Sequence, residues 1–279
     1  MNLPQKLDLN SNDWKSVQST AIFIGSVYIL FYTSIEKTLT CLTKRGIKNE
    51  RILRQGERHK MGKYNFDEVI DRHGTDCLKY DFGMKRKGRD DLLPLWVADM
   101  DFRLPDEILD EFHKRIDHGI FGYTDPLDEY FAAMNHWFST RYGYTIEPDW
   151  VTLGAGIVYA LGTSVRAFTE EGDAMMVMQP VYYPFSEVIK NDGRRLVNCQ
   201  LRYENNHYSI DFEKMERMIL EEGVKALIFC NPHNPVGRVW TREEMEKVAE
   251  ICLKYNVIWM VDEMHCDFIF PGHEFTSCM

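Results

Sequence analysis

Two glycine- or proline-containing segments carry groups that could hold an aromatic, phosphorylated ligand. Residues 152–157 (TLGAGI) form a glycine-rich turn that leads into a helix. Small residues there let backbone N–H groups and the positive end of the helix approach a phosphate. Residues 179–184 (QPVYYP) place Tyr182 just after an expected strand, where its ring could lie flat on an aromatic ligand. Taken singly, the segments also suit an ordinary helix-opening turn and a loop with packed tyrosines.

A third segment, NPHNPVGR at residues 231–238, gives a stronger indication of a binding site. The repeated Asn-Pro step and the glycine favour an extended, tightly turned backbone. The side-chain amide of Asn234 can donate a hydrogen bond to an anionic oxygen. Generic turns rarely repeat Asn-Pro at this spacing, so the segment favours a specific role.

The fourth segment, VDEMH at residues 261–265, ends an apolar run. A carboxylate at this place, that of Asp262, would face the crevice where open α/β sheets bind ligands. If it is buried, its natural partner is a cationic atom of the ligand. A solvated acidic loop is one alternative. A metal site is another, suggested by the neighbouring side chains of Asp262, His265, Cys266, Asp267 and His273. They lack a recognised ligand spacing, so no metal is predicted.

The elements that position these segments follow from apolar periodicity. Helical spacing predicts helices from Pro105 to Gly119, from about Leu127 to Tyr142, and from the glycine-rich turn toward Phe168. Short apolar runs predict buried strands at 174–178, 225–230 and 257–261. Helices alternate with these strands, which is typical of βαβ units with a mostly parallel sheet. A capping box is predicted where Glu244 follows Thr241 by three residues.

Composition narrows the class of protein. With 44% hydrophobic and 27% charged residues, the 279-residue chain has ample material for a buried core. Its net charge of -10 argues against a nucleic-acid-binding surface, which relies on Lys and Arg. The seven cysteines form no CxxC pair, which favours free thiols in a reducing compartment. We therefore expect a cytoplasmic protein.

Residues 1–60 differ in character from the rest. The apolar run Ala21–Tyr32 precedes a basic stretch at residues 44–60. The run is shorter than the ~20 residues that span a bilayer. It also lacks the basic start and cleavage site of a secretory signal. A short helix or strand, or an extension outside the working domain, is favoured over a membrane anchor, and Met61 opens the functional part.

The order of the glycine-rich turn, P-x-Y, NPHNPVGR and VDE-x-H resembles fold-type-I pyridoxal-phosphate (PLP) enzymes of the class I/II aminotransferase family. LPLWVADMDF at 93–102, FGY at 121–123 and DEMHCDFIFPGHEF at 262–275 are similar to its cystathionine β-lyase-like branch, the MalY/PatB-type C–S lyases. The resemblance implies an α/β chain of the aspartate-aminotransferase fold, with a mostly parallel sheet and helices on both faces. The domains implied are an unassigned extension (1–60), an arm with part of the small domain (61–110), and an incomplete large PLP-binding domain (111–279).

The resemblance also implies roles in holding PLP. Tyr182 would stack on the pyridine ring, and Asn234 would hydrogen-bond its phenolic oxygen. Asp262 would pair with the protonated ring nitrogen, and His265 would lie near the phenolic oxygen. The cofactor phosphate would be held by the backbone N–H groups of Ala155, Gly156 and Ile157.

Further implied roles concern the substrate and a second subunit. Tyr123 would reach the phosphate of a neighbouring subunit, which makes the site part of a homodimer. Val97 and Ala98 would line the substrate side. The peptide bonds into Pro180 and Pro235 are expected to be cis.

The activity implied is β-elimination on a small sulfur amino acid such as cystathionine, giving pyruvate, ammonia and a thiol. An aminotransferase of the same fold is the runner-up, and a non-catalytic fragment that acts by binding is the third reading. No lysine follows Lys254, so the Schiff-base lysine is expected beyond Met279. No catalytic residue is therefore assigned within the chain, and we expect the chain as given to be an inactive, truncated product.

Overall fold

The computed structural model describes residues 22–24, 64–89 and 91–279. Two compact units are present, one made of Met1–Ile29 with Met134–Met279 and the other of Leu30–Ala133. The basic stretch at 44–60, Cys41, and the apolar run apart from Ile22–Ile24 lie outside the described residues. No helix in the described ranges is long and apolar enough to cross a membrane.

A parallel sheet forms the centre of the first unit, with strand order β1-β7-β6-β2-β3. Its strands are β1 (Ile22–Ile24), β2 (Ala174–Val177), β3 (Arg195–Asn198), β6 (Val224–Cys230) and β7 (Ile258–Asp262). The three strands predicted from apolar runs are confirmed as β2, β6 and β7, with ends shifted by one residue. β1 falls within the N-terminal apolar run and pairs with β7. The predicted parallel sheet is therefore confirmed.

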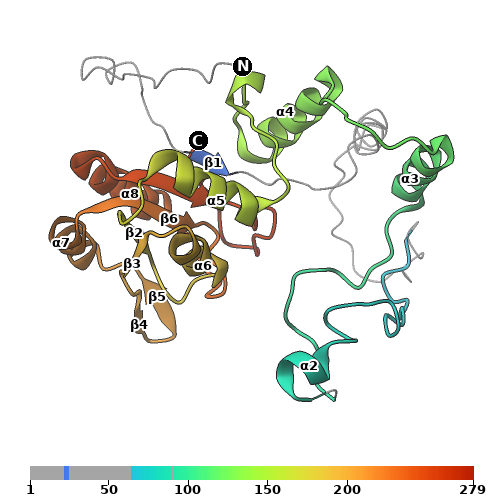
Figure 1. Cartoon of the computed structure of the whole chain (residues 1–279), viewed down its shortest axis with the longest axis horizontal. Helices are drawn as coiled ribbons and strands as arrows, with labels where there is room; N and C mark the ends of the chain where they lie inside the picture. Colours follow the sequence, from blue (N-terminus) through green and yellow to red (C-terminus); the bar gives the residue numbers. More distant parts are fainter. Residues whose placement is uncertain (1–21, 25–63, 90) are drawn as a thin grey trace. The chain divides into compact units, whose positions relative to one another are not determined.

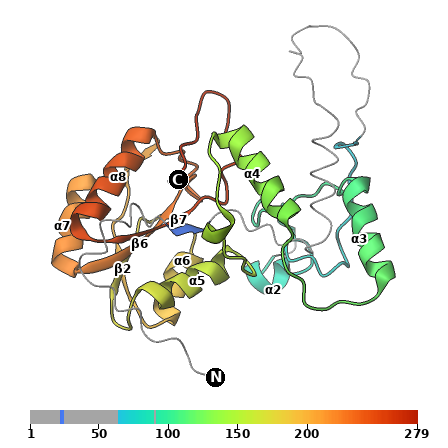
Figure 2. The ribbon, with the colours of Figure 1, turned by 90° about the horizontal axis from the view of Figure 1, so that it is seen from above.

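Helices cover both faces of this sheet, as predicted. They are α5 (Ile157–Phe168), α6 (Pro184–Asn191), α7 (Phe212–Glu222) and α8 (Arg242–Tyr255). Successive side chains of a strand point to opposite faces. Accordingly Met175 of β2 packs with α5 and α6, whereas Met176 packs with α7 and α8. Figures 1 and 2 show these two helical layers on either side of the strands. The core therefore has two halves divided by the sheet.

Local sequence explains where several elements begin and end. The capping box predicted before α8 is present, with the Thr241 hydroxyl accepting from the Glu244 N–H and the Glu244 carboxylate accepting from the Thr241 N–H. β4 (Arg202–Glu204) and β5 (His207–Ser209) form an antiparallel hairpin. Both residues of its turn, Asn205 and Asn206, have positive φ, which asparagine tolerates well. A 3-10 turn, η2 (Pro148–Trp150), precedes α5.

The second unit contains α2 (Gly83–Lys87) and α3 (Asp106–His118), and α4 (Asp128–Tyr142) runs from it into the first. The helices predicted around α3 and α4 are confirmed. Pro105 is the residue before α3 and not its first helical residue, and Gly119 ends the helix with a positive φ. Among the described residues of this unit, only Cys77 and Lys79 are buried. The apolar faces of its helices are thus not buried among the described residues of the unit.

Candidate functional site

Three of the four segments whose residues could bind a ligand meet at one edge of the sheet. β7, β6 and β2 are neighbours in the strand order and run parallel, so their carboxyl ends share that edge. The QPVYYP segment follows β2, the NPHNPVGR segment follows β6, and Asp262 ends β7. The Asn231 N–H donates to the Asp262 backbone carbonyl at 2.9 Å, which ties two of them together. This is the edge at which open parallel sheets bind ligands.

Asp262 is a buried carboxylate that lacks a cation. Its residue is 5% exposed, and its Oδ1 accepts one hydrogen bond, from the Met264 N–H at 2.9 Å. Burial raises its pKa to about 6, against the smaller opposing effect of the Met264 N–H. It forms no ion pair within the part of the chain that the structure describes. A buried anion is strongly disfavoured unless it is paired, so this carboxylate suits a cationic ligand atom.

Tyr182 lies half-buried on the loop after β2. Its ring packs edge-on against Phe185 of α6, with centroids 5.9 Å apart and an interplanar angle of 85°. Burial raises the pKa of its hydroxyl, with further contributions from Tyr183 and from Asp262.

The start of α5 offers uncapped backbone donors. The helix begins at Ile157 with Gly156 as its N-cap, at φ 143, and no side chain caps it. The Gly156 carbonyl accepts from the Ala160 N–H at 2.9 Å, so the helix is formed from its first turn. The first N–H groups of a helix have no partner within it, and they favour an anion. Ile157 and its N-cap Gly156 thus form an uncapped helix start, and the phosphate contacts expected of Ala155, Gly156 and Ile157 stay a prediction.

The NPHNPVGR segment forms a closed turn. The His233 N–H donates to the Arg238 carbonyl at 2.7 Å, and the Gly237 N–H donates to the His233 carbonyl at 2.8 Å. The side-chain amide of Asn234 makes no hydrogen bond within the described residues, which leaves it free for a ligand. The peptide bonds into Pro180 and Pro235 are cis, as predicted, and the bond into Pro232 is cis as well.

The structure gives less support for the ligand roles of the other predicted residues. His265 is half-buried on the turn after β7, and burial lowers its pKa. Its ring lies near that of Phe268, with centroids 6.5 Å apart, so a ligand role for His265 stays a prediction. Tyr123, Val97 and Ala98 are exposed and belong to the second unit, and their roles also stay predictions.

Sequence reasoning missed Glu263, which lies beside Asp262 and is 1% exposed. Its carboxylate accepts from the Ser277 hydroxyl at 2.9 Å and from the Cys278 N–H at 2.8 Å. Burial raises its pKa to about 7. The acidic pair in VDEMH was a signal, but the sequence alone does not show which carboxylate is tied to its own chain. The described residues contain no group of three His, Cys, Asp or Glu side chains that could hold a metal ion.

The two buried carboxylates predict a pH dependence of stability. Both have folded-state pKa values, about 6 for Asp262 and about 7 for Glu263, above the usual 3.8 and 4.5. Their protonated forms favour the folded state, so this stabilisation is complete below about pH 4 and is lost as pH rises through 6 to 7. We expect Asp262→Asn to reduce this loss, measured by urea unfolding at pH 5 and pH 8 without ligand. If the free energy of unfolding changed between pH 5 and pH 8 by the same amount in Asp262→Asn as in the unmodified chain, Asp262 would not titrate in this range.

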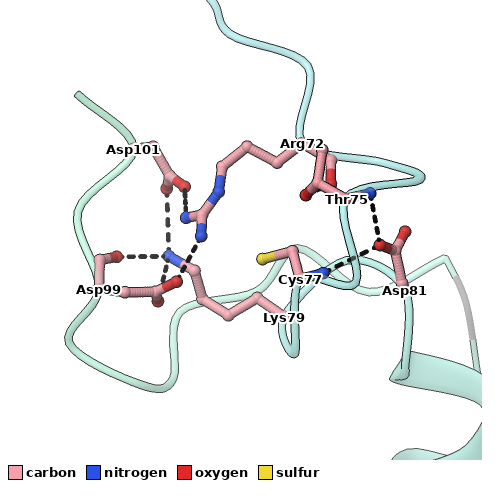
Figure 3. A network of polar contacts seen from close by, with 7 residues as sticks. All are labelled: Arg72, Thr75, Cys77, Lys79, Asp81, Asp99 and Asp101. Carbon is pink, nitrogen blue, oxygen red and sulfur yellow. Dashed lines mark hydrogen bonds and ion pairs between the residues drawn. The ribbon is translucent and has the colours of Figure 1, made fainter. Parts of the chain in front are cut away.

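A network of ion pairs holds the segment that contains Val97 (Figure 3). The Arg72 guanidinium pairs with Asp99 and Asp101, at 2.5 Å each. The Lys79 ammonium lies 3.1 Å from the Asp99 carboxylate and 3.2 Å from that of Asp101, and donates to the Asp99 carbonyl at 2.8 Å. Two cations and two anions thus fix the backbone just after Val97.

Val97 has φ 61, the left-handed region that a β-branched residue rarely adopts. Such strain costs on the order of 1–3 kcal/mol and persists where the surroundings hold it. We expect Val97→Gly to relieve it, with a net local gain of about 1 kcal/mol after the larger entropy loss of glycine. Cleavage within residues 93–102 under limited proteolysis should then slow about fivefold. Val69→Gly is the control, because Val69 is exposed and not in the left-handed region. Faster cleavage in Val97→Gly would contradict the strain.

Comparisons with known proteins agree with this geometry. The family model described as aminotransferase class I and II matches residues 90–278. Cystathionine beta-lyase PatB of Bacillus subtilis is 42% identical over 212 residues, which are 76% of this chain and 55% of that protein. Protein MalY of Escherichia coli is 33% identical over 74% of this chain and 53% of its own length. The chain thus spans about half the length of these relatives.

Solved structures show the same relationship. Cystalysin from Treponema denticola, whose structure contains a pyridoxal 5'-phosphate cofactor, matches with TM-score 0.72 and 39% identity over 77% of this chain and 55% of its own. The PLP-bound C-S lyase from Staphylococcus hominis matches with TM-score 0.70 and 33% identity, over 76% of this chain and 54% of its own. These matches confirm the predicted aspartate-aminotransferase type of fold. The chain belongs to the aminotransferase class I and II family.

Proposed function

We propose that the complete protein containing this chain is a PLP-dependent carbon–sulfur β-lyase. The observation that carries the proposal is the buried, cation-free carboxylate of Asp262 at the end of β7. The relatives named cystathionine beta-lyase and C-S lyase point to the reaction class. An acidic chain with free thiols further favours a cytoplasmic protein.

The residues of this chain fit PLP by the chemistry of their groups. Asp262 would hold a proton on the ring nitrogen, because its buried carboxylate pairs with no cation among the described residues. Asn234 would donate to the phenolic oxygen, and Tyr182 would cover one face of the ring and exclude water. The phosphate would lie at the uncapped start of α5, at Ile157. When bound, PLP supplies an electron sink for the pair released as the Cα–H bond breaks.

The reaction balances without an oxidant or a reductant. The Cα–H and Cβ–S bonds of the amino acid break, and the sulfur leaves as a thiol. The remaining carbon skeleton takes up one water and gives pyruvate and ammonia. In this scheme the chain binds and orients the reactants, and none of its residues is assigned to removing the Cα proton. Val97 and Ala98 would lie on the substrate side, and Tyr123 would serve the site of a second subunit in a homodimer.

The test is an assay of the complete protein with PLP and L-cystathionine. We expect pyruvate and free thiol in equal amounts. Release of neither product would overturn the proposal. Conversion to the corresponding 2-oxo acid in the presence of an amino acceptor, without thiol, would assign the protein to the aminotransferases instead.

A further inference from the structure

His233, in the middle of the NPHNPVGR segment, is fixed by backbone hydrogen bonds and by ring packing. It has no part in the PLP contacts proposed above. It is 2% exposed. Its backbone closes the turn through the bonds to Arg238 and Gly237. Its ring stands edge-on to Trp240, with centroids 5.5 Å apart and an interplanar angle of 89°. The imidazole therefore has one fixed orientation.

The imidazole makes one side-chain hydrogen bond of standard length among the described residues, from its Nε2 to the Pro180 carbonyl oxygen at 3.0 Å, and the backbone of Cys230 and Met178 also interacts with the ring. A carbonyl oxygen can only accept, so Nε2 carries the proton and donates. The other nitrogen, Nδ1, is buried and has no hydrogen-bond partner among the described residues. Burial also lowers the pKa of the ring to about 4, which keeps it neutral. Leaving a buried nitrogen unpaired costs stability, so folding alone does not explain a histidine at this position.

The contact joins two loops that are far apart in the sequence. Pro180 and His233 are 53 residues apart, on the loops after β2 and β6. Pro180 lies two residues before Tyr182, and His233 immediately precedes Asn234. The Nε2–H donation therefore links the loop that presents an aromatic ring to the loop that presents a free amide. No other side-chain hydrogen bond in the described part of the chain joins these two loops.

We propose that His233 is a positioning residue, whose hydrogen bond to Pro180 sets the spacing between Tyr182 and Asn234 around the PLP ring. The proposal rests on the proposed function, because it assumes that these two side chains contact the same ring. It adds a residue that touches neither cofactor nor substrate and acts through the two loops.

The test measures binding of pyridoxamine 5'-phosphate to the 279-residue chain by tryptophan fluorescence. This probe carries the ring and the phosphate and needs no lysine to bind. His233→Phe keeps a flat ring but removes the donor, and we expect its dissociation constant to rise about 3- to 10-fold, the size of one hydrogen bond. His233→Gln places an amide N–H close to the position of Nε2 and should restore binding to near the unmodified value. His113→Phe, on the exposed surface of α3, is the control and should leave binding unchanged.

His233→Asn is the second loss-of-donor variant, because its shorter amide reaches only the position of Nδ1. We expect it to weaken binding as His233→Phe does, which keeps the test valid if one variant folds poorly. Equal affinities for the unmodified chain and both loss-of-donor variants would overturn the positioning role of His233 and leave the proposed function standing. Failure of His233→Gln to restore binding would do the same. No binding by the unmodified chain would overturn this inference, whereas the proposed function would fall only if the complete protein released neither pyruvate nor thiol from L-cystathionine.

Discussion

Replacing Asp262 by asparagine is expected to lower kcat of the complete protein by roughly 100- to 1,000-fold, the effect of removing one preorganised electrostatic group. Asparagine keeps the size of the side chain and an oxygen that can accept from the Met264 N–H. It removes the negative charge that would keep the ring nitrogen protonated, so the ring would withdraw electrons less well. The measurement is steady-state pyruvate formation from L-cystathionine with saturating PLP.

Two comparisons make the Asp262 result specific. Asp149→Asn changes the same chemistry at an exposed position on η2 and should leave kcat unchanged. The thermal unfolding midpoint of Asp262→Asn should not fall, because an unpaired buried carboxylate becomes neutral. An Asp262→Asn protein with the kcat of the unmodified enzyme would remove the observation on which the proposed function rests.

Replacing Trp240 by alanine is expected to cost about 3–5 kcal/mol in the free energy of unfolding. Trp240 is fully buried and donates from its indole Nε1 to the Cys230 carbonyl at 2.8 Å. Its ring packs against Phe229 of β6, with centroids 5.8 Å apart. The substitution leaves a large cavity and an unpaired carbonyl at the end of β6. Urea unfolding followed by circular dichroism measures the change.

Trp150→Ala provides the matched comparison for Trp240. Trp150 is 64% exposed on η2, so its loss should change the free energy of unfolding by no more than about 0.5 kcal/mol. A loss for Trp240→Ala as small as that expected for Trp150→Ala would mean that Trp240 is not part of a cooperative core. The attachment of the NPHNPVGR turn to the end of β6 would then not depend on Trp240.

The central strands could be predicted because they are buried on both faces. β2 is apolar throughout and β6 is apolar from Ala226 to Cys230, which is typical of parallel strands covered by helices. β3 was not predicted, since its strand begins with the exposed Arg195 and contains a single buried residue, Val197. The β4–β5 hairpin was missed for a similar reason, because every residue of β4 is exposed.

The segments of the candidate site could be predicted from the sequence, but the hydrogen bond between its loops could not. Segments at the ends of parallel strands must meet at one edge, so the sequence already indicated that the segments of Tyr182, Asn234 and Asp262 share that edge. The bond from His233 to Pro180 spans 53 residues and depends on the register of two loops. Nothing in the sequence encodes which nitrogen of a histidine meets which carbonyl, so that link needed the structure.

The most direct test of the central claim is the protonation of a bound ring nitrogen. Pyridoxamine 5'-phosphate labelled with 15N in the ring is added to the 279-residue chain, and its 15N chemical shift is followed as pH rises. We expect the bound nitrogen to keep its proton to higher pH than the free ligand does, and Asp262→Asn to abolish this difference. A bound nitrogen that loses its proton at the same pH as the free ligand would contradict a pairing with Asp262.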